Sequence, residues 1–503
     1  MFNPFIYLLF TFASINWFLI FTPAFQFASF NWFLIWTCTL SAALIARHPF
    51  VDGFYFGDTL WVSSYALLVL FILTIFLIGY LYTLFNSSVS RYKELPLLFL
   101  IIYFGFTTLM LSNDLLVLYL SIELFSLTFY LITTIHQNYY TTEAGIKYFI
   151  FSFLAGAFYL LGCALIYLDY GTINFIHLTE LTERYALGAV ANDAGLMGEG
   201  FAAAASYLPN GAFTGYFGFI FIIISFLFKL SIAPFHFWTP DVYQGALYPV
   251  TAFFTIFPKF VIATFLLKLY LYVLYAPYLN YLFMFCGLLS VFIGSMGALT
   301  QYNIKRLFAY STISNAGFLI ILIAMGTPLS SQYFFFYILT YLIANLGLFT
   351  LLIQLNTSNM LGLKSILGAT GEGSDLASLR SSSTYAILLS LPVLSLAGLP
   401  PLVGFIAKYL TIYLTFSSDL IFIAVILLGF SILSLFYYLR FVHYIFFYGR
   451  ADVGGRKAVG KEGSQPDLYQ SYVAVLANIA LLFFSFNPSL LFLTSSVFSS
   501  LVS

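Results

Sequence analysis

Residues 228–246 read Phe-Lys-Leu-Ser-Ile-Ala-Pro-Phe-His-Phe-Trp-Thr-Pro-Asp-Val-Tyr-Gln-Gly-Ala, and they continue an apolar run that begins near Tyr216. That run is long enough to enter a membrane, yet it carries Lys229 and then Pro234. A charge at bilayer depth costs free energy, so it normally faces protein or a water-filled cavity, and a proline breaks the helix. A lysine beside a helix break is typical of a protein that moves charge, although a kinked helix with a snorkelling lysine would show the same pattern.

The composition excludes a soluble globular protein. Of the 503 residues, 62% are hydrophobic and only 7% are charged, far from the usual balance. The formal net charge of zero gives no electrostatic case for nucleic-acid binding. Cys38, Cys163 and Cys286 are isolated in apolar runs, so we predict buried small side chains rather than metal ligands or redox pairs. The apolar run at 5–19 is predicted to be part of a permanent span rather than a signal peptide.

Apolar runs of the length that a membrane-spanning helix needs recur along the whole chain. We therefore predict an all-α, polytopic membrane protein of about 14 transmembrane helices. The predicted helices are 5–22, 30–46, 61–86, 96–112, 114–135, 147–169, 216–238, 249–275, 279–299, 305–326, 332–355, 383–413, 419–447 and 469–494.

The distribution of Lys and Arg over the loops predicts the orientation of the chain. Longer loops lie at 172–214, 356–382 and 449–467. If the helices alternate in direction, about eleven basic residues lie on one side, and Arg47 and Arg184 lie on the other. Positive charge collects on the cytoplasmic or matrix side, so both termini are predicted to face the opposite, outer side. The eleven are Arg91, Lys93, Lys147, Lys305, Arg306, Lys364, Arg380, Arg450, Arg456, Lys457 and Lys461.

Four ionisable residues inside predicted helices are the candidate site. Glu123, Lys229 and Lys259 each lie near the middle of a predicted span, and Lys408 follows a second break at Pro400-Pro401. A static ion pair between the glutamate and one lysine is the structural alternative. One carboxylate cannot neutralise three ammonium groups, which favours a row of groups that gain and lose protons. Burial lowers the pKa of a lysine and a nearby carboxylate raises it, so such a residue can switch its charge.

The remaining polar residues are weaker candidates for the site. His236 follows the first break, where it could gate water or satisfy freed carbonyl groups. Lys268 is predicted to snorkel to the membrane interface, and Arg440 to be structural. Asp114, Glu143 and Lys147 are predicted at helix ends. The sequence has no phosphate-binding loop, metal-ligand cluster or nucleophile constellation, so we predict no cofactor or metal in this chain.

The two breaks also predict an internal symmetry. The predicted helices 4–8 and 9–13 form two five-helix units, and the fourth helix of each unit is broken by proline. An odd number of helices inverts the second unit against the first, as in transporters with inverted repeats. The predicted segments are 1–95 (three helices), 96–275 (first repeat), 276–448 (second repeat) and 449–503 (charged loop and last helix). The match is imperfect, because Lys229 precedes its break and Lys408 follows its own.

Several of these motifs together resemble subunit 2 of respiratory complex I, an antiporter-like family of membrane subunits. Residues 228–246 resemble its signature, and the Trp-Thr-Pro-Asp-Val-Tyr-Gln-Gly portion favours subunit 2 over its sister subunits. The resemblance runs from about Asp114 to Arg440. The other matching motifs are Asn303-Ile-Lys-Arg-Leu-Phe-Ala-Tyr-Ser-Thr-Ile-Ser314, Leu394-Ser-Leu-Ala-Gly-Leu-Pro400 with Gly404-Phe-Ile-Ala-Lys408, and Tyr437-Tyr-Leu-Arg440.

The resemblance implies a proton-translocating subunit of an NADH:ubiquinone oxidoreductase, with Glu123, Lys229, Lys259 and Lys408 as its channel residues. NADH, FMN, iron–sulfur clusters and ubiquinone are then expected in other subunits. The expected partners are neighbouring membrane-arm subunits and lipids, in the mitochondrial inner membrane, with both termini toward the intermembrane space. The alternatives are a subunit of a multisubunit cation/proton antiporter and a non-pumping structural membrane subunit.

Overall fold

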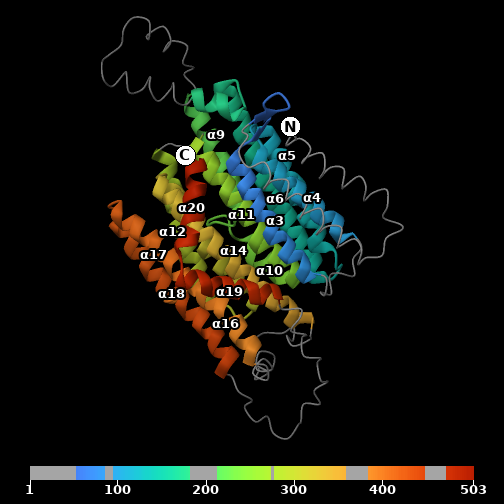
Figure 1. The fold of residues 1–503 in the computed structure, drawn as a ribbon. Coiled ribbons are helices and arrows are strands. Elements are labelled where there is room, and N and C mark those ends of the chain that lie inside the picture. Colours follow the sequence, from blue (N-terminus) through green and yellow to red (C-terminus); the bar gives the residue numbers. More distant parts are fainter. Residues whose placement is uncertain are drawn as a thin grey trace, which may run out of the picture.

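The computed structural model describes residues 53–84, 94–181, 212–272, 277–357, 383–447 and 472–502. Within these ranges the chain forms a bundle of long helices (Figure 1). The predicted helices at 5–22 and 30–46, the charged loop at 449–467 and Cys38 lie outside the described residues. So do most of the loops at 172–214 and 356–382.

The first part of the bundle is built from apolar runs that become helices where they were expected. A short hairpin precedes them, because Leu60–Val62 pairs antiparallel with Gly53–Tyr55 instead of opening the third predicted helix. The elements are β1 (Gly53–Tyr55), β2 (Leu60–Val62), α3 (Ser64–Leu84), α4 (Leu95–Leu111), α5 (Leu115–Thr134), α6 (Tyr139–Tyr170), α9 (Ala212–Leu230), α10 (Trp238–Gly245) and α11 (Tyr248–Tyr272).

Helix α6 begins eight residues before the predicted start at 147. The backbone N–H of Asn138 donates to Thr141 Oγ1 at 3.0 Å, which closes the first turn, and Gly171 ends the helix in the left-handed conformation. Glu143 and Lys147, predicted at a helix end, lie in the first turns of α6, and their side chains form an ion pair at 2.8 Å. The hydrophobic pattern missed this start because the first turns are polar.

The second part of the bundle contains the second break. Its helices are α12 (Pro277–Leu299), α13 (Ile304–Met325), α14 (Pro328–Thr357), α16 (Ser383–Ala397), α17 (Val403–Ser417), α18 (Ile421–Phe447), α19 (Tyr472–Phe486) and α20 (Ser489–Val502). Among the described residues, eight helices are long and apolar enough to cross a membrane, or up to nine if a bent pair counts as one span. The shorter apolar helices include α9, the first half of the first broken helix, and α16 and α17, the two halves of the second.

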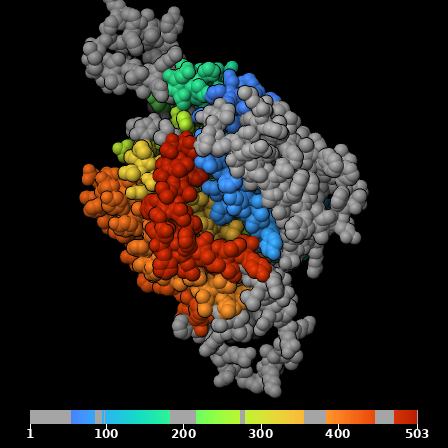
Figure 2. All heavy atoms as spheres, viewed as in Figure 1, coloured from blue at the N-terminus to red at the C-terminus, as the bar shows by residue number. Residues whose placement is uncertain are grey.

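The last predicted helix, 469–494, is wrong as a single element. The structure has two helices, α19 and α20, bent by 92°. Pro488 stands at the bend, and proline disfavours helical geometry in the residue before it, which explains the break. Helix α20 runs along the bundle while α19 runs across it (Figure 1). Together they cover one face beside α3 (Figure 2).

Helices α11, α13 and α14 form the centre of the bundle. All of the apolar window of α11 and 94% of those of α13 and α14 are buried inside the protein, against 39% in α6 and 28% in α18. The outer faces of α6 and α18 carry exposed apolar side chains, including Phe153, Leu168, Phe422 and Val425. Such faces suit contact with lipid or with other membrane proteins. Lys259 therefore lies on the most buried helix of the described chain.

Candidate proton-relay site

The first broken helix ends at Leu230, four residues before Pro234, so the predicted helix at 216–238 is interrupted earlier than expected. After Leu230 the backbone of Ser231 turns into the left-handed region, with φ of 59°. Its N–H donates to the carbonyl of Phe228 at 3.1 Å, and the N–H of Ile232 donates to that of Leu227 at 2.9 Å. This paired arrangement is a common helix end, but glycine usually occupies the left-handed position. A serine there costs about 1 kcal/mol or more, so the position is unusual.

The gap between α9 and α10 is held by further hydrogen bonds. The indole Nε1–H of Trp238 donates to the Phe228 carbonyl at 3.0 Å, and the N–H of Phe235 donates to the Ile232 carbonyl at 2.8 Å. Pro234 is exposed within the gap. Carbonyl groups freed inside a membrane must find partners within the protein. This hydrogen bond explains why the signature at residues 228–246 contains a tryptophan at position 238.

Lys229 lies in the last turn of α9, and 7% of its surface is exposed. Its Nζ has no hydrogen-bond partner among the described residues. It lines a small cavity of about 10 Å³ together with Ser152 and Ala155 of α6 and with Trp238. This volume is close to what one water molecule needs, and Lys229 and Ser152 place polar side chains in a mainly apolar wall. The lysine therefore faces a space that one water could occupy, not a fixed ion-pair partner.

Glu123 lies on α5 and packs against Gly156 of α6. One carboxylate oxygen accepts a hydrogen bond from the Ser126 hydroxyl at 3.2 Å, and the other has no partner among the described residues. A side chain at Gly156 would collide with that free oxygen. Glu123 interacts electrostatically with Lys229, but the ion pairs of the described residues do not include this pair. The static ion pair considered as an alternative is not formed in this structure.

Lys259 connects α11 to the first break. Only 4% of its surface is exposed, and its Nζ donates to the Ser231 hydroxyl oxygen at 2.9 Å. The Ser231 hydroxyl in turn donates to the Leu230 carbonyl at 2.6 Å. Pro258 directly precedes Lys259 inside α11. The hydroxyl that joins Lys259 to the break was not identified from the sequence, because nothing in the local pattern indicates a partner 28 residues away.

The second broken helix repeats the hydrogen bonds of the first. Helix α16 ends at Ala397, and Gly398 takes the left-handed position with φ of 82°. The N–H of Gly398 donates to the Ser395 carbonyl at 3.0 Å, and the N–H of Leu399 donates to the Leu394 carbonyl at 3.3 Å. Pro400 and Pro401 are exposed in the gap, and α17 begins at Val403. The predicted second break is thus present, with glycine where the first break has Ser231.

Lys408 points back from α17 onto the end of α16. Its surface is 6% exposed, and its Nζ donates to the Ala397 carbonyl at 2.9 Å and to the Ser434 hydroxyl at 3.1 Å. A side chain at Gly398 would meet the Lys408 Cδ at 3.0 Å. Lys408 and Lys259 therefore share an arrangement, because each ammonium lies at the C-terminal end of the first half of a broken helix. That end carries partial negative charge, which stabilises a cation there.

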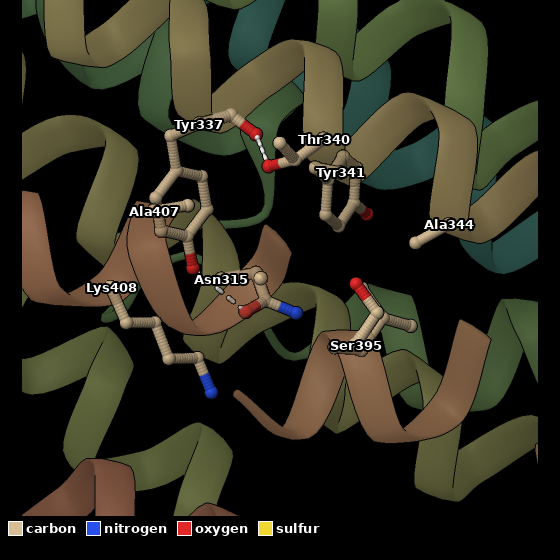
Figure 3. Close-up of a pocket in the computed structure, with 10 residues that line it drawn as sticks. Asn315, Tyr337, Thr340, Tyr341, Ala344, Ser395, Ala407 and Lys408 are labelled. Atoms are coloured by element: carbon tan, nitrogen blue, oxygen red, sulfur yellow. Dashed lines mark hydrogen bonds between the residues drawn. The ribbon is translucent and has the colours of Figure 1, made fainter. Parts of the chain in front are cut away.

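A second cavity, of about 20 Å³, lies beside Lys408 (Figure 3). Its polar wall includes Asn315 of α13, Tyr337 and Tyr341 of α14, and Ser395 of α16. The Tyr337 hydroxyl donates to Asn315 Oδ1 at 3.0 Å. The volume is sufficient for one water molecule.

Tyr341 connects this cavity to the helix of Lys259. Its hydroxyl donates to the Thr255 carbonyl at 3.3 Å, one turn before Lys259 on α11. Neither Tyr341 nor its neighbour Asn315 was among the residues predicted for the site. The available signal was the polar run Ser311-Thr312-Ile313-Ser314-Asn315 within an apolar helix, which predicts a buried polar surface.

His236 and the remaining charged residues lie outside this row. The His236 side chain is buried, its ring centroid lies 4.6 Å from that of Phe237, and its Nδ1 has no hydrogen-bond partner among the described residues. Its predicted gating role stays a prediction. Lys268 is buried under the Trp61 ring, 4.4 Å from the centroid, instead of snorkelling to open interface. Arg440 donates to the Ala298 and Gln301 carbonyls at 3.3 Å, which fits its predicted structural role.

A charged cluster at one end of the bundle joins its two parts. Asp241 of α10 pairs with Lys147 of α6 at 3.0 Å and with Arg306 of α13 at 3.5 Å. The side chains are between about a third and two fifths exposed, so each pair adds at most about 1 kcal/mol. Within the part of the chain that the structure describes, no three His, Cys, Asp or Glu residues gather as metal ligands.

Residues 112–434 match the family model described as "NADH:quinone oxidoreductase/Mrp antiporter, TM". The chain belongs to this family. The matched region contains all four predicted relay residues and both broken helices. The resemblance to the antiporter-like subunits of complex I is thereby confirmed.

Two relatives of this antiporter-like subunit illustrate the match. This chain is 34% identical to NADH-quinone oxidoreductase subunit N of a Wolbachia species from Brugia malayi, over 70% of this chain and 69% of the relative. It is also 34% identical to NADH-ubiquinone oxidoreductase chain 2 of Marchantia polymorpha, over 67% of this chain and 63% of the relative. Subunits named for one enzyme therefore recur in a bacterium and in a plant.

Solved structures share the fold of this antiporter-like subunit. A chain of respiratory complex I from Thermus thermophilus superposes with a TM-score of 0.74 and 23% identity, covering 97% of this chain and 98% of that one. A chain of the Mrp complex from Dietzia gives a TM-score of 0.79 with 18% identity, covering 98% and 96%. At these identities the likeness establishes the fold alone.

Proposed function

We propose that this chain is a proton-translocating membrane-arm subunit of an NADH:quinone oxidoreductase, driven by quinone reduction in other subunits. The observation that carries the proposal is the placement of three buried lysines around two helix breaks, none of them paired with a carboxylate among the described residues. A structural role alone does not require three such groups, because each one costs free energy to bury.

The proposed order of proton stops is Glu123, Lys229, Lys259 and Lys408. A proton leaves one ammonium group to a water molecule in an adjacent cavity, and the amine left behind accepts the next proton. The Ser231 hydroxyl links the break that follows Lys229 to Lys259. Tyr341 and the cavity beside Lys408 extend the row into the second part of the bundle. Hydroxyl groups suit this task because each both donates and accepts hydrogen bonds.

The architecture that goes with this function is an inverted repeat within about 14 helices. The matching hydrogen bonds at Ser231 and Gly398 support a correspondence between the two broken helices. The boundaries proposed above, 96–275 and 276–448, separate the units around these breaks. Such repeats bring a site to the membrane midplane at their interface.

The chain spans a membrane several times, and plant mitochondrial relatives such as chain 2 of Arabidopsis thaliana favour the mitochondrial inner membrane. We infer that its partners are other membrane-arm subunits of the same complex and that both termini face the intermembrane space. We further infer that NADH, FMN, iron–sulfur clusters and ubiquinone bind in other subunits. A cation/proton antiporter subunit is the alternative within the same family.

The test replaces each lysine by alanine in the intact complex: Lys229→Ala, Lys259→Ala and Lys408→Ala. A positioned proton-transfer group contributes about 10²-fold or more to a rate, so coupled quinone reduction and proton pumping should fall to a small fraction. Electron transfer from NADH to an artificial acceptor that bypasses the membrane arm should persist. Lys268→Ala is the matched control, because Lys268 is equally buried on α11 but lies outside the row.

The structural alternative predicts the reverse pattern. If Lys229 serves only the fold, Lys229→Ala should impair assembly, and complexes that assemble should pump normally. Near-normal pumping by an assembled Lys229→Ala complex would overturn the relay.

A further inference from the structure

Helix α16 contains a carbonyl group that its own helix cannot satisfy. Pro392 lies inside α16, and proline has no N–H to donate to the carbonyl four residues earlier, that of Leu388. Within a membrane protein such a carbonyl must find another donor inside the protein. The donor is therefore informative about which element holds this helix in place.

That donor comes from the C-terminal helix α19. Asn478 is 2% exposed, and its Nδ2 donates to the Leu388 carbonyl at 2.9 Å. Helix α14 meets the same point through Gly347, where an added Cβ would lie 3.2 Å from Ala477 Cβ and 3.9 Å from Pro392 Cβ. Three helices thus meet at the proline, and a larger residue on α14 would disturb the contact.

The turn that follows Pro392 belongs to the second cavity. Ser395 and Leu396 line it, and the Ala397 carbonyl accepts the hydrogen bond from Lys408 Nζ. The position of that carbonyl depends on the direction in which α16 leaves its proline. The Asn478 hydrogen bond lies about two turns earlier on the same helix, so it can set that direction.

We propose that Asn478 is a positioning residue for Lys408, acting through the proline of α16. The C-terminal helix α19, which lies beyond the region matched by the family model, would then hold the second broken helix in its working geometry. The proposal rests on the proposed function only for its effect on pumping. Its effect on the geometry of α16 can be measured independently.

The experiment compares Asn478→Leu, Pro392→Ala and the double variant in the intact complex. Leucine is similar in size to asparagine but cannot donate, so it leaves the Leu388 carbonyl without a partner. Alanine at 392 restores an N–H to that carbonyl within α16. Amide hydrogen exchange in the peptide covering 393–398 should be about tenfold or more faster in Asn478→Leu. In that variant the buried Leu388 carbonyl loses its partner, so α16 should open more often around its proline. The double variant should return toward the parent protein, in exchange and in protons pumped per electron.

Gln332→Leu is the matched control. Gln332 Nε2 approaches the Phe492 carbonyl of α20 at 3.5 Å, so this variant also removes an amide contact to the C-terminal helices. It does not touch Pro392 and should leave exchange at 393–398 unchanged. Faster exchange in this control would attribute the effect to a general loosening and overturn the proposal.

Other outcomes separate this proposal from the proposed function. Unchanged exchange and pumping in Asn478→Leu, alongside a pumping defect in Lys408→Ala, would overturn the role of Asn478 alone. A defect in Asn478→Leu that Pro392→Ala does not rescue would mean that Asn478 acts by packing, which also contradicts the proposal. If the double variant restores exchange while Lys408→Ala pumps normally, the positioning role of Asn478 is supported and the proton relay is overturned.

Discussion

The Nζ of Lys259 donates a hydrogen bond to the hydroxyl oxygen of Ser231 at 2.9 Å. Ser231 stands two residues after Lys229, at the point where the first half of the broken helix ends. The contact joins the most buried helix of the described chain to the unwound segment. Any change in the break that moves Ser231 therefore changes the surroundings of Lys259.

Ser231→Gly and Ser231→Ala should separate backbone strain from proton transfer. Both variants remove the hydroxyl, so both should lower coupled quinone reduction and proton pumping. Glycine accepts the left-handed conformation without penalty, and so it should stabilise the break by about 1 kcal/mol relative to alanine. Thermal unfolding of the purified complex would measure the stability difference, and proton pumping in vesicles would measure the activity.

Ser225→Ala is the control for this pair. Its hydroxyl is buried on α9 but makes no hydrogen bond among the described residues, so its loss should leave pumping unchanged. Normal pumping in both Ser231 variants would remove Ser231 from the relay.

Gly156→Ala should disturb Glu123 without changing its charge. A methyl group at 156 would collide with the free carboxylate oxygen, so the carboxylate must move. We expect reduced pumping in an assembled complex, because small displacements of a proton-transfer group lower its rate steeply. Gly429→Ala on α18 is the matched control: a Cβ there meets no atom within 4 Å. If the two variants pump equally, the position of Glu123 is not critical.

The orientation can be tested on residues 449–467, which lie outside the described part of the chain. With both termini toward the intermembrane space, this charged loop faces the matrix. A protease should therefore cut it in inside-out inner-membrane vesicles and leave it intact in right-side-out ones. The opposite pattern would invert the proposed topology.

The absence of a redox centre can be tested on the isolated chain. It carries no phosphate-binding loop, and its three cysteines are far apart in sequence. The purified subunit should therefore show no flavin, haem or iron–sulfur absorption, whereas the intact complex, as the positive control, should show such bands. A stoichiometric chromophore that remains with the isolated subunit would contradict the prediction.

Strong local signals explain what could be predicted before the structure. Continuous apolar runs located most of the helices from α3 to α18, because burial in a membrane demands a long apolar segment. The start of α6 and the end of α9 were each eight residues off, and α10 was not predicted as a separate helix. Pro234 and the Pro400-Pro401 pair located both breaks, because proline removes a backbone hydrogen bond and disfavours a helix interior. Pro258 and Pro392, by contrast, lie inside the continuous helices α11 and α16. The charges at 123, 229, 259 and 408 stood out because charge inside an apolar run is rare.

Sequence patterns predicted element boundaries least well where the polarity of the residues does not follow the backbone geometry. The start of α6 was predicted too late because its first turns are polar, although Asn138 and Thr141 close the helix there. The bend before α20 was missed because both sides of Pro488 are apolar, so hydropathy averaged over a window runs through it. The hairpin at β1 and β2 was missed because each strand has only three residues.

The sequence alone determined which four charged residues lie inside membrane-spanning helices. The position of a carboxyl or amino group along an apolar run sets its depth in the membrane. Their partners are a property of the fold. Ser231 lies 28 residues from Lys259, and Leu388 lies 90 residues from Asn478, so only tertiary packing could bring these atoms within hydrogen-bond distance. A hydrogen bond depends on distance and direction between two groups, and neither quantity is encoded in the spacing of residues along a single helix.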